Sequence, residues 1–560
     1  MSRLLVAQRA LTVPGWAKDA LWRRAQAIPS LDLRFADNKS LVDATTGSNL
    51  VTHTRASSGT FVGSDGVLRS AVTNLLLRSE EFSDAAWVQP AIVSANTEIA
   101  PNGTLTADTI TSGGGANSVY QNVSVLASTI YTASVYAKLG TMSSSDYKVA
   151  VYNNSASNFI AADVTPSQTP NSSGWTRVTY TFTTPVGCTS VRWYPFRNGS
   201  AIPLSTVYLW GAQLEQSATV GEYIPTTSTI NSAPRFDHDP TTGESLGLLV
   251  EESRTNLLLQ SEDFSTSWTT VTATVTTNVA TAPNGTTTAD LYSGTSTSAV
   301  NQSVSLTSGV TYTISFYVKS AGLGNDSFRL RIDGAQTSSN FTATSEWQRF
   351  TFTATSANTG ARTCGIVRNT AGDNVDVLLW GAQLEAGAFP TSYIPTVAAT
   401  VTRAADVASI TGSNFSSWYR QDEGTVFVNG ITPPNRADFP SLNTLHDGTS
   451  NNRLLQYVFT SGYFSAARVG SVPQGDNTAA VTPTDGSAYK VASAFAVNNS
   501  VTAVNGVTGS VDTLCLMPTA LNTLAIGAEW NNANIVNSTI RRLTFWPTRL
   551  SNEVLQRITQ

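Results

Sequence analysis

An internal duplication constrains most strongly what this chain can fold into. The string Thr-Asn-Leu-Leu-Leu occurs at residues 73–77 and again at 255–259, and the string Trp-Gly-Ala-Gln-Leu-Glu occurs at 210–215 and again at 380–385. Tyr-Ile-Pro-Thr follows both copies of the second string, and tryptophans and tyrosines recur in the same order between the two strings. Chance does not produce so many ordered matches, so we infer that one structural module is present twice.

The spacing between matched residues indicates where the two copies differ. It is nearly constant as far as Tyr136 and then shortens before Trp175 and its counterpart Trp347. Insertions accumulate in surface loops. The first copy is therefore expected to carry a longer loop between Gly140 and Ser157.

The residue pattern inside each copy is that of β-strands. Segments such as 131–138 and 311–319 alternate with a period of two and are rich in β-branched and aromatic residues. Short strands separated by turn signals indicate an antiparallel sandwich or jelly roll. No amphipathic helix interrupts either copy, which argues against an α/β enzyme fold. We predict an all-β chain of tandem antiparallel β-sandwich (jelly-roll) domains with a short helical N-terminal segment.

The rest of the chain divides by its composition. Residues 1–30 form a helical and net basic stretch, and Asn505-Gly506 marks a hairpin near the other end. Ser551 is a suitable N-cap for a terminal helix over 550–558. The predicted segments are a basic helical anchor (1–30), a β-rich connector (31–72), the first module (73–230), a linker (231–254), the second module (255–400) and a terminal jelly roll (401–560).

Charge and cysteine content argue against several classes of function. Charged residues make up only 13% of the chain, and the net charge is −5. This balance gives no reason to expect nucleic acid binding or attraction to an anionic membrane. No apolar run reaches the roughly 18 to 20 residues of a membrane span. The three cysteines are far apart in the sequence, so we expect buried thiols and not disulfides or metal ligands.

Groups suited to catalysis are scarce. The three histidines, His53, His238 and His446, lack metal-ligand spacing. Two pairs of adjacent carboxylates, Glu80-Glu81 and Glu251-Glu252, would point to opposite faces of a strand, so neither forms a glycosidase pair. Carboxylates brought together from distant segments stay open as an alternative. We predict no enzyme activity, no catalytic residue, no metal site and no cofactor.

Aromatic residues offer candidates for stacking against sugars. Those present in both copies, such as Trp87 and Trp268, are expected in the core, because residues that two copies share serve their common fold. Aromatics that are not repeated are the better candidates, since a sugar site needs flat rings and planar polar groups. The predicted glycan-binding residues are Arg192, Trp193, Tyr194 and Asn198 in the first module, and Trp530, Asn531 and Asn532 in the terminal domain. Packing of the first group against a neighbouring domain is the alternative.

The repeated strings resemble those of a known group of proteins. Thr-Asn-Leu-Leu-Leu-x-Ser-Glu-x-Phe-Ser, followed by Trp-Gly-Ala-Gln-Leu-Glu and Tyr-Ile-Pro-Thr, is similar to carbohydrate-binding-module-like sandwiches in bacteriophage tail and head-fibre proteins. The segments 402–406, 418–419 and 423–425 resemble the junction into a concanavalin/laminin-G-like jelly roll in the same proteins. The resemblance covers roughly residues 60–560. It implies a place on the virion surface and a role in adhesion.

The function expected from these features is that of a phage virion surface protein, a fibre, spike or decoration, that adheres to bacterial surface polysaccharide. Its N-terminus would bind other virion proteins, and neither nucleic acid nor membrane is an expected partner. A site with one or two rings binds a sugar weakly, so adhesion favours a homo-oligomer. A trimer is the first guess, by analogy with phage fibres. The alternatives are a structural spacer without glycan affinity and a surface-polysaccharide hydrolase.

Overall fold

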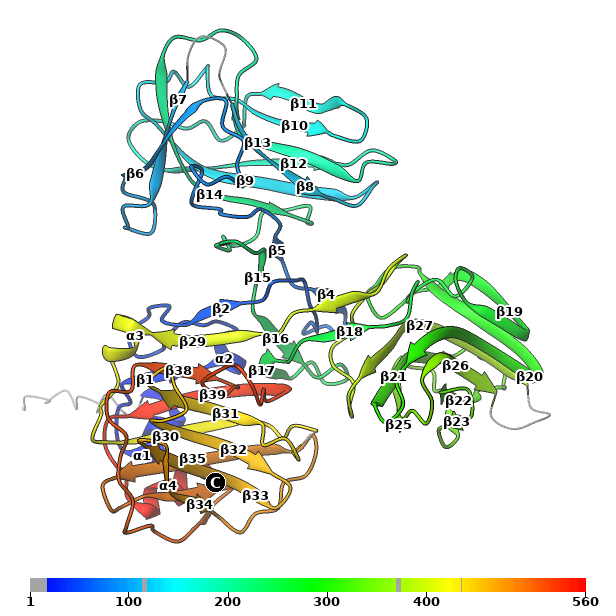
Figure 1. Cartoon of the computed structure of the whole chain (residues 1–560), viewed down its shortest axis with the longest axis vertical. Coiled ribbons are helices and arrows are strands. Elements are labelled where there is room, and N and C mark those ends of the chain that lie inside the picture. Colours follow the sequence, from blue (N-terminus) through cyan, green and yellow to red (C-terminus); the bar gives the residue numbers. More distant parts are fainter. Residues whose placement is uncertain (1–17, 113–117, 369–373, 435) are drawn as a thin grey trace, which may run out of the picture. The chain divides into compact units, whose positions relative to one another are not determined.

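The structure, a computed structural model, describes residues 18–112, 118–368, 374–434 and 436–560. Antiparallel strands dominate it, which confirms the all-β fold class (Figure 1). The chain divides into two compact units. The smaller unit contains residues 54–59 and 70–233, and the larger contains the described parts of 1–53, 60–69 and 234–560. No helix among the described residues is long and apolar enough to cross a membrane.

The smaller unit is a sandwich of two antiparallel sheets that contains the first module. One sheet has four strands, in the order β11 (Asn158–Val164), β10 (Val149–Asn153), β13 (Ser190–Arg197) and β8 (Ser118–Ser124). The other has five, in the order β12 (Thr176–Thr183), β9 (Ile130–Leu139), β14 (Ser205–Glu215), β7 (Ala107–Ser112) and β6 (Ile92–Glu98). The chain enters and leaves this sandwich through two short paired strands, β5 (Thr73–Asn74) and β15 (Asn231–Ser232).

The second module repeats this architecture within the larger unit. Its strands form one bent sheet in the order β23 (Gln336–Thr337), β22 (Ser327–Ile332), β26 (Gly360–Arg368), β20 (Ala289–Leu306), β27 (Val375–Ala386), β21 (Thr311–Ser320) and β25 (Gln348–Thr355), with β19 (Thr269–Ala280) beside β20 and β24 (Phe341–Thr342) beside β22. The first part of β20 pairs with β27 and its last part pairs with β26, so this strand belongs to both layers. Strands β18 (Arg254–Asn256) and β28 (Val401–Arg403) pair where the chain enters and leaves.

The repeated asparagine of the Thr-Asn-Leu-Leu-Leu string closes each module. In the second module, Asn256 Nδ2 donates to the carbonyls of Ala382 and Ile394 at 3.0 and 2.9 Å. Its Oδ1 accepts from the backbone N–H groups of Leu258 and Leu384, both at 3.1 Å. Asn74 makes the equivalent four bonds in the first module. The motif is therefore structural, because it ties the entering strand to the strand that carries Trp-Gly-Ala-Gln-Leu-Glu.

The repeated tryptophans are also structural. Trp87 and Trp268 are buried, and each donates its indole N–H to a backbone carbonyl, that of Arg78 or Gln260. Each packs on the phenylalanine of the repeated Phe-Ser pair. The prediction that shared aromatics belong to the core is confirmed for this pair.

The terminal domain is a third sandwich. One sheet contains β16 (Arg235–His238), β17 (Ser245–Val250), β39 (Ser538–Trp546), β30 (Glu423–Ile431), β35 (Ala488–Ala496), β36 (Val501–Val504) and β37 (Val507–Thr508), with β1 (Leu31–Leu33) beside β39. The other contains β2 (Thr52–Thr54), β29 (Val407–Thr411), β38 (Thr523–Ile526), β31 (Ser441–His446), β32 (Arg453–Phe459), β33 (Gly462–Val469) and β34 (Val472–Thr478). A two-stranded ribbon, β3 (Thr60–Val62) and β4 (Leu68–Ser70), precedes the first module.

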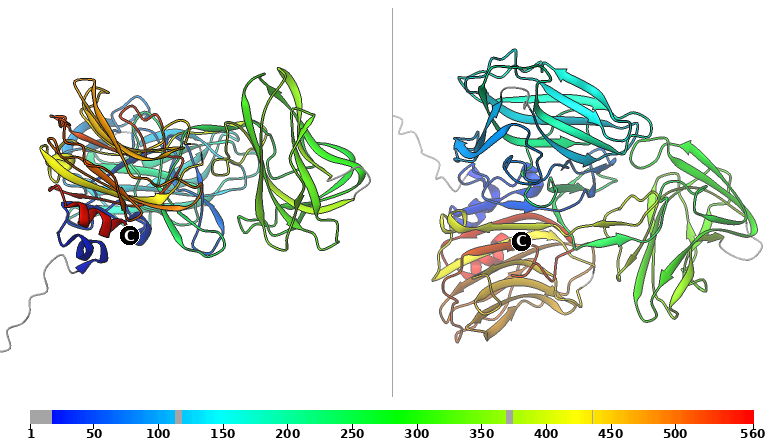
Figure 2. Two further views of the ribbon diagram at one scale, coloured as in Figure 1. Left: turned by 90° about the horizontal axis from the view of Figure 1, so that it is seen from below. Right: turned by 45° about the horizontal axis from the view of Figure 1, so that its top comes forward.

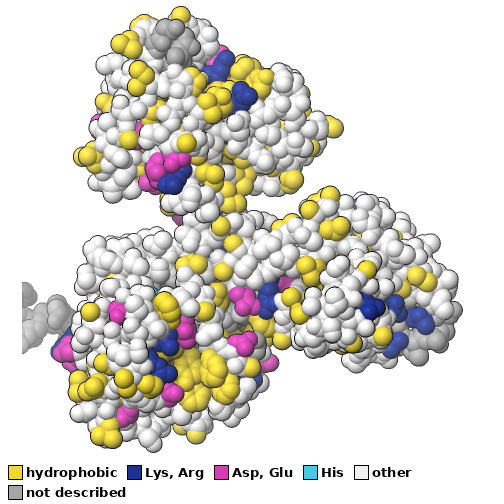
Figure 3. All heavy atoms as spheres, in the orientation of Figure 1, with side chains coloured by type: hydrophobic (Ala, Val, Ile, Leu, Met, Phe, Trp, Pro, Cys, Tyr) yellow, Lys and Arg dark blue, Asp and Glu magenta, His cyan; other side chains and the backbone are white. Residues whose placement is uncertain are grey.

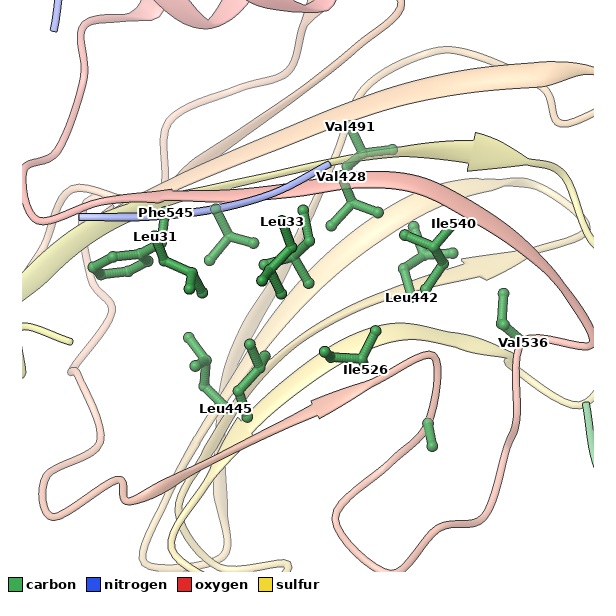
Figure 4. Packing of buried hydrophobic residues seen from close by; sticks show 14 of the residues in the cluster. Leu31, Leu33, Val428, Leu442, Leu445, Val491, Ile526, Val536, Ile540 and Phe545 are labelled. Carbon is green, nitrogen blue, oxygen red and sulfur yellow. The ribbon is translucent and has the colours of Figure 1, made fainter. Parts of the chain in front are cut away.

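The core of this sandwich is aliphatic. Leu31, Val428 and Ile540 of one sheet point toward Leu442 and Ile526 of the other (Figure 4). The expected hairpin is present, since Asn505 and Gly506 join β36 to β37 with positive φ at both residues, as a two-residue type I′ turn requires.

The terminal sandwich is discontinuous in sequence, which the sequence-based domain boundaries did not anticipate. Leu31 pairs with Phe545, and Leu248 pairs with Ile540. Strand β1 thus comes from the predicted connector and strand β17 from the predicted linker. In chain order, the first module follows strands β1 and β2, and the second module follows β17. Both modules are therefore insertions between strands of one terminal sandwich.

The segment predicted as a helical anchor contains one described helix, α1 (Ala20–Ala25), capped by the Asp19 side chain. Its Leu21 and Trp22 pack with the terminal helix α4 (Asn552–Thr559), and Figure 2 shows the two helices side by side. Ser551 caps α4 as predicted. Two short helices, α2 (Phe35–Asn38) and α3 (Gly412–Ser416), complete the fold. Residues 1–17 lie outside the described residues, so the predicted attachment through the N-terminus stays a prediction.

Candidate functional site

The structure places three of the four residues predicted in the first module on β13, on two different sides of the strand. Val191 and Trp193 point inward, and Trp193 is fully buried in the module's core. Arg192 and Tyr194 alternate with them and lie on the outer face of the four-stranded sheet. Trp193 is therefore a core residue, and it presents no ring face to a ligand.

Asn198 also has a structural role. Its Nδ2 donates to the backbone carbonyl of Asp146 at 2.8 Å, and its Oδ1 accepts from the N–H of Ser200 at 3.0 Å. The side chain is 7% exposed. It holds the turn after β13 and leaves Arg192 and Tyr194 as the two predicted residues on the outer face.

Other residues join this pair on the outer face. Tyr120 comes from β8, Tyr152 from β10, and Phe159 from β11. The ring centroids of Tyr120 and Tyr194 lie 4.8 Å apart, and those of Tyr152 and Phe159 lie 4.9 Å apart. We call Tyr120, Tyr152, Phe159, Tyr194, Arg192 and Arg197 the aromatic–arginine face.

The two arginines lie over these rings. The Arg192 guanidinium is 5.1 Å from the Tyr120 centroid and 5.0 Å from the Tyr152 centroid. The Arg197 guanidinium is 4.4 Å from the Phe159 centroid, within the range of cation–π attraction. Hydrophobic and basic side chains are visible together over β10, β11 and β13 in Figure 3.

Hydrogen bonds fix the orientation of both guanidinium groups. Arg192 Nε donates to Asn122 Oδ1 at 3.2 Å, and Arg197 pairs with Asp163. Asp163 also accepts from the backbone N–H of Gly199 at 3.1 Å. A preorganised site loses little side-chain entropy on binding. The face therefore offers planar cations and one exposed ring, Phe159, which is 37% exposed.

The residues predicted in the terminal domain lie in the loop between β38 and β39. Trp530 is half-buried, whereas Asn531 and Asn532 are exposed. Asn531 Oδ1 accepts from the N–H of Ala533 at 3.1 Å, and Asn532 adopts a φ of 58°. Trp530 is the one aromatic residue between β38 and β39. This loop offers a single aromatic group and two amides.

A second aromatic group on the terminal domain was largely missed by sequence reasoning. Phe439 stacks on Phe459 at 4.4 Å with the planes 4° apart, and Tyr457 stacks on Phe464 at 5.2 Å. It forms a hydrophobic patch over β32 in Figure 3. The signal that could have found it is alternation, because Tyr457 and Phe459 are two residues apart on one strand and so share a face.

Ionisable groups at the centre of the larger unit form buried pairs. Arg235 Nη2 lies 2.5 Å from Asp406 Oδ2, and its Nη1 lies 2.8 Å from Glu251 Oε2. Desolvation raises the pKa of Glu251, but Arg403 and Arg235 outweigh it and hold that pKa at about 2. Within the described residues, no group of three or more His, Cys, Asp or Glu side chains could hold a metal ion.

Comparison with known proteins does not assign a family. No family model matches the chain, and no curated protein matches its sequence. Among solved structures, the tandem CBM22-1-CBM22-2 domain of Paenibacillus barcinonensis Xyn10C aligns over 57% of this chain and 98% of its own, at 15% identity and a TM-score of 0.24. Domains LG4-5 of the mouse laminin α1 chain align over 53% and 88%, at 8% identity and a TM-score of 0.16. A native heptameric SAP-like pentraxin from Limulus polyphemus aligns over 24% and 68%, at 14% identity and a TM-score of 0.20. Similarity at this level decides nothing about function.

Proposed function

We propose that this chain is a non-enzymatic adhesion protein that binds bacterial surface polysaccharide through the aromatic–arginine face of its first module. The face itself is the supporting observation. It combines rings at stacking distance with two oriented guanidinium groups on the outer surface of a sheet. Rings contact the C–H faces of sugars, and planar donors bind their hydroxyls.

A place on the surface of a phage virion is part of the same proposal. It rests on the resemblance of the repeated strings to those of phage fibre proteins. The weak affinity expected of one shallow face implies that several copies act together. Attachment to other virion proteins would use the N-terminus.

One observation favours the alternative of a structural spacer. The rings of the face already contact one another, and the arginines already lie over them, so Tyr194 is only 6% exposed. The same contacts would stabilise an outer sheet surface that binds nothing. A functional test must therefore remove groups whose loss leaves the fold intact.

The test combines Phe159→Ala and Arg192→Ala in the full chain, because both side chains lie outside the core. The matched control is Tyr208→Ala, a half-buried tyrosine on the other sheet of the same module. Binding to an array of bacterial surface polysaccharides is measured after thermal unfolding shows that each variant is folded. We expect at least a tenfold loss for the double variant, about 1.4 kcal/mol, and no loss for the control. No binding by the parent protein would favour the spacer, and equal binding by all three proteins would rule out this face as the site.

A further inference from the structure

The second module carries an arginine cluster on its counterpart of the aromatic–arginine face. Strand β22 places Phe328, Leu330 and Ile332 in the core. Arg329 and Arg331 alternate with these residues and therefore lie on the outer face. Both are half-buried, so their stems lie along the sheet.

Arg368 is the last residue of the neighbouring strand β26 and is half-buried. It lies opposite Phe328 in the pairing of β22 with β26, so its side chain starts on the core side at the end of the sheet, and its charge acts on Arg331 from there. Burial lowers the pKa of Arg331, and repulsion from Arg368 and Arg329 lowers it further. Basic side chains gather over β22 and β26 in Figure 3. We call Arg329, Arg331 and Arg368 the arginine cluster.

The cluster has no carboxylate partner within the described ranges of the chain. Arg329 makes a long hydrogen bond, from its Nη1 to Thr337 Oγ1 at 3.4 Å. By contrast, Arg362 on the same strand β26 pairs with Asp333 at 3.0 Å. In the first module, Arg197 pairs with Asp163. Three adjacent cations without a counter-charge repel one another, and an anion would relieve that repulsion.

The two modules differ here in the shape of the sheet surface as well as in charge. The faces align through a glutamine, Gln121 or Gln302, that accepts from the backbone of the repeated leucine string in each copy. Counted from this glutamine, Tyr194 of the first module corresponds to Gly365 of the second, which lies opposite Arg331. The second module thus has bare backbone where the first has a ring.

Gly365 cannot be replaced without a clash. A Cβ at this position would lie 2.2 Å from the carbonyl oxygen of Val300. The surface beside Arg331 is therefore kept open by the backbone itself.

We infer that the arginine cluster of the second module binds an acidic saccharide, a chain of uronic acid units, and this inference rests on the proposed glycan-binding function. Guanidinium groups bind carboxylates through paired N–H donors. Arg329 and Arg331 are two residues apart on one face of β22, so their positions lie about 7 Å apart along the strand and both can face carboxylates of one extended chain. A net charge of −5 for the whole chain disfavours the dense phosphate array of a nucleic acid.

The experiment measures binding of the full chain to pentagalacturonate and to its methyl ester, which has the same backbone without charge. The variant is Arg329→Gln combined with Arg331→Gln, which keeps the stems and hydrogen-bonding ends but removes two charges. Arg362→Gln is the matched control, because this arginine is on the same sheet but already paired with Asp333. Calorimetric titration at low and high salt gives the affinities, and thermal unfolding confirms that each protein is folded.

We expect the acid to bind at least tenfold more tightly than its ester, with an affinity that falls as salt rises. The affinity of the double variant for the acid should fall at least tenfold, and its affinity for the ester should not change. The Arg362→Gln control should keep both affinities. Equal affinities for acid and ester would overturn the inference, as would unchanged binding by the double variant. Tighter binding to an oligothymidylate than to the uronate would assign the cluster to nucleic acid.

A further variant separates this inference from the proposed function. Phe159→Ala with Arg192→Ala alters only the first module. If that variant loses neutral glycans while the chain never binds uronate, the inference alone fails. If no array polysaccharide binds but uronate does, the proposed site in the first module fails and the inference stands.

Discussion

Replacement of Asn256 by Ala tests whether the repeated asparagine closes each module. The change removes four buried hydrogen bonds, two to the carbonyls of Ala382 and Ile394 and two from the N–H groups of Leu258 and Leu384. A typical hydrogen bond contributes about 1 kcal/mol net, so the four together contribute about 4 kcal/mol. The free energy of unfolding of a domain is about 5 to 15 kcal/mol, so this loss is a large share of the stability of the module.

Native-state hydrogen exchange measures this loss module by module in the full chain. We expect the protected amides of β21 and β27 to lose about 4 kcal/mol of opening free energy, and those of β9 and β14 in the other unit to change little. Asn74→Ala should produce the reverse distribution. Asn284→Ala is the control, since this half-buried turn residue accepts from the N–H and hydroxyl of Thr286 within its own turn and should cost at most about 1 kcal/mol. A loss for Asn256→Ala no larger than that of the control would refute the reasoning.

Three further changes test the fold. Trp87→Ala and Trp268→Ala should each destabilise their own module by about 3 to 5 kcal/mol in the same exchange experiment, and a loss below about 1 kcal/mol would show that the indole is not part of the core. Burial lowers the pKa of His446 to about 4. The unfolded chain therefore binds a proton first, and stability falls as pH drops from about 6.5 to about 4. His446→Asn keeps an acceptor for the Gly448 N–H. As pH falls through that window, the free energy of unfolding of this variant should rise by up to about 3 kcal/mol relative to that of the parent. A difference in unfolding free energy that does not change with pH would refute the assignment. Deletion of residues 1–30 should lower the melting temperature of the terminal sandwich, because it removes Trp22 from the core shared with α4; an unchanged melting temperature would contradict this.

Local sequence signals predicted the elements that depend on local chemistry. The hairpin at Asn505-Gly506 follows from the positive φ that both residues tolerate, and the start of α4 follows from the Ser551 cap. The duplicated modules follow from the repeated strings, since each repeated residue satisfies the same backbone groups twice. These features could be derived from short stretches of the chain.

Features that depend on distant pairing left no such signal. Leu31 pairs with Phe545, and nothing near either residue indicates the other. Trp193 is a different case, because alternation with Arg192 and Tyr194 already assigns it to the side of Val191. Its aromatic character suggested a sugar site, but strand periodicity decides which way a side chain points.

The duplication also explains where function can diverge. Residues that close the module, such as Asn74 and Asn256, keep the same bonds in both copies and cannot change without loss of stability. Most side chains of the outer face carry no such constraint, because they point away from the core; Gly365 is an exception. One copy has rings beneath paired or stacked arginines there, and the other has Gly365 beside arginines that pair with no carboxylate among the described residues. On the proposed function, two modules with one fold and two different surfaces would bind different parts of a mixed polysaccharide, and linkage in one chain would raise the effective concentration of the second contact once the first had formed.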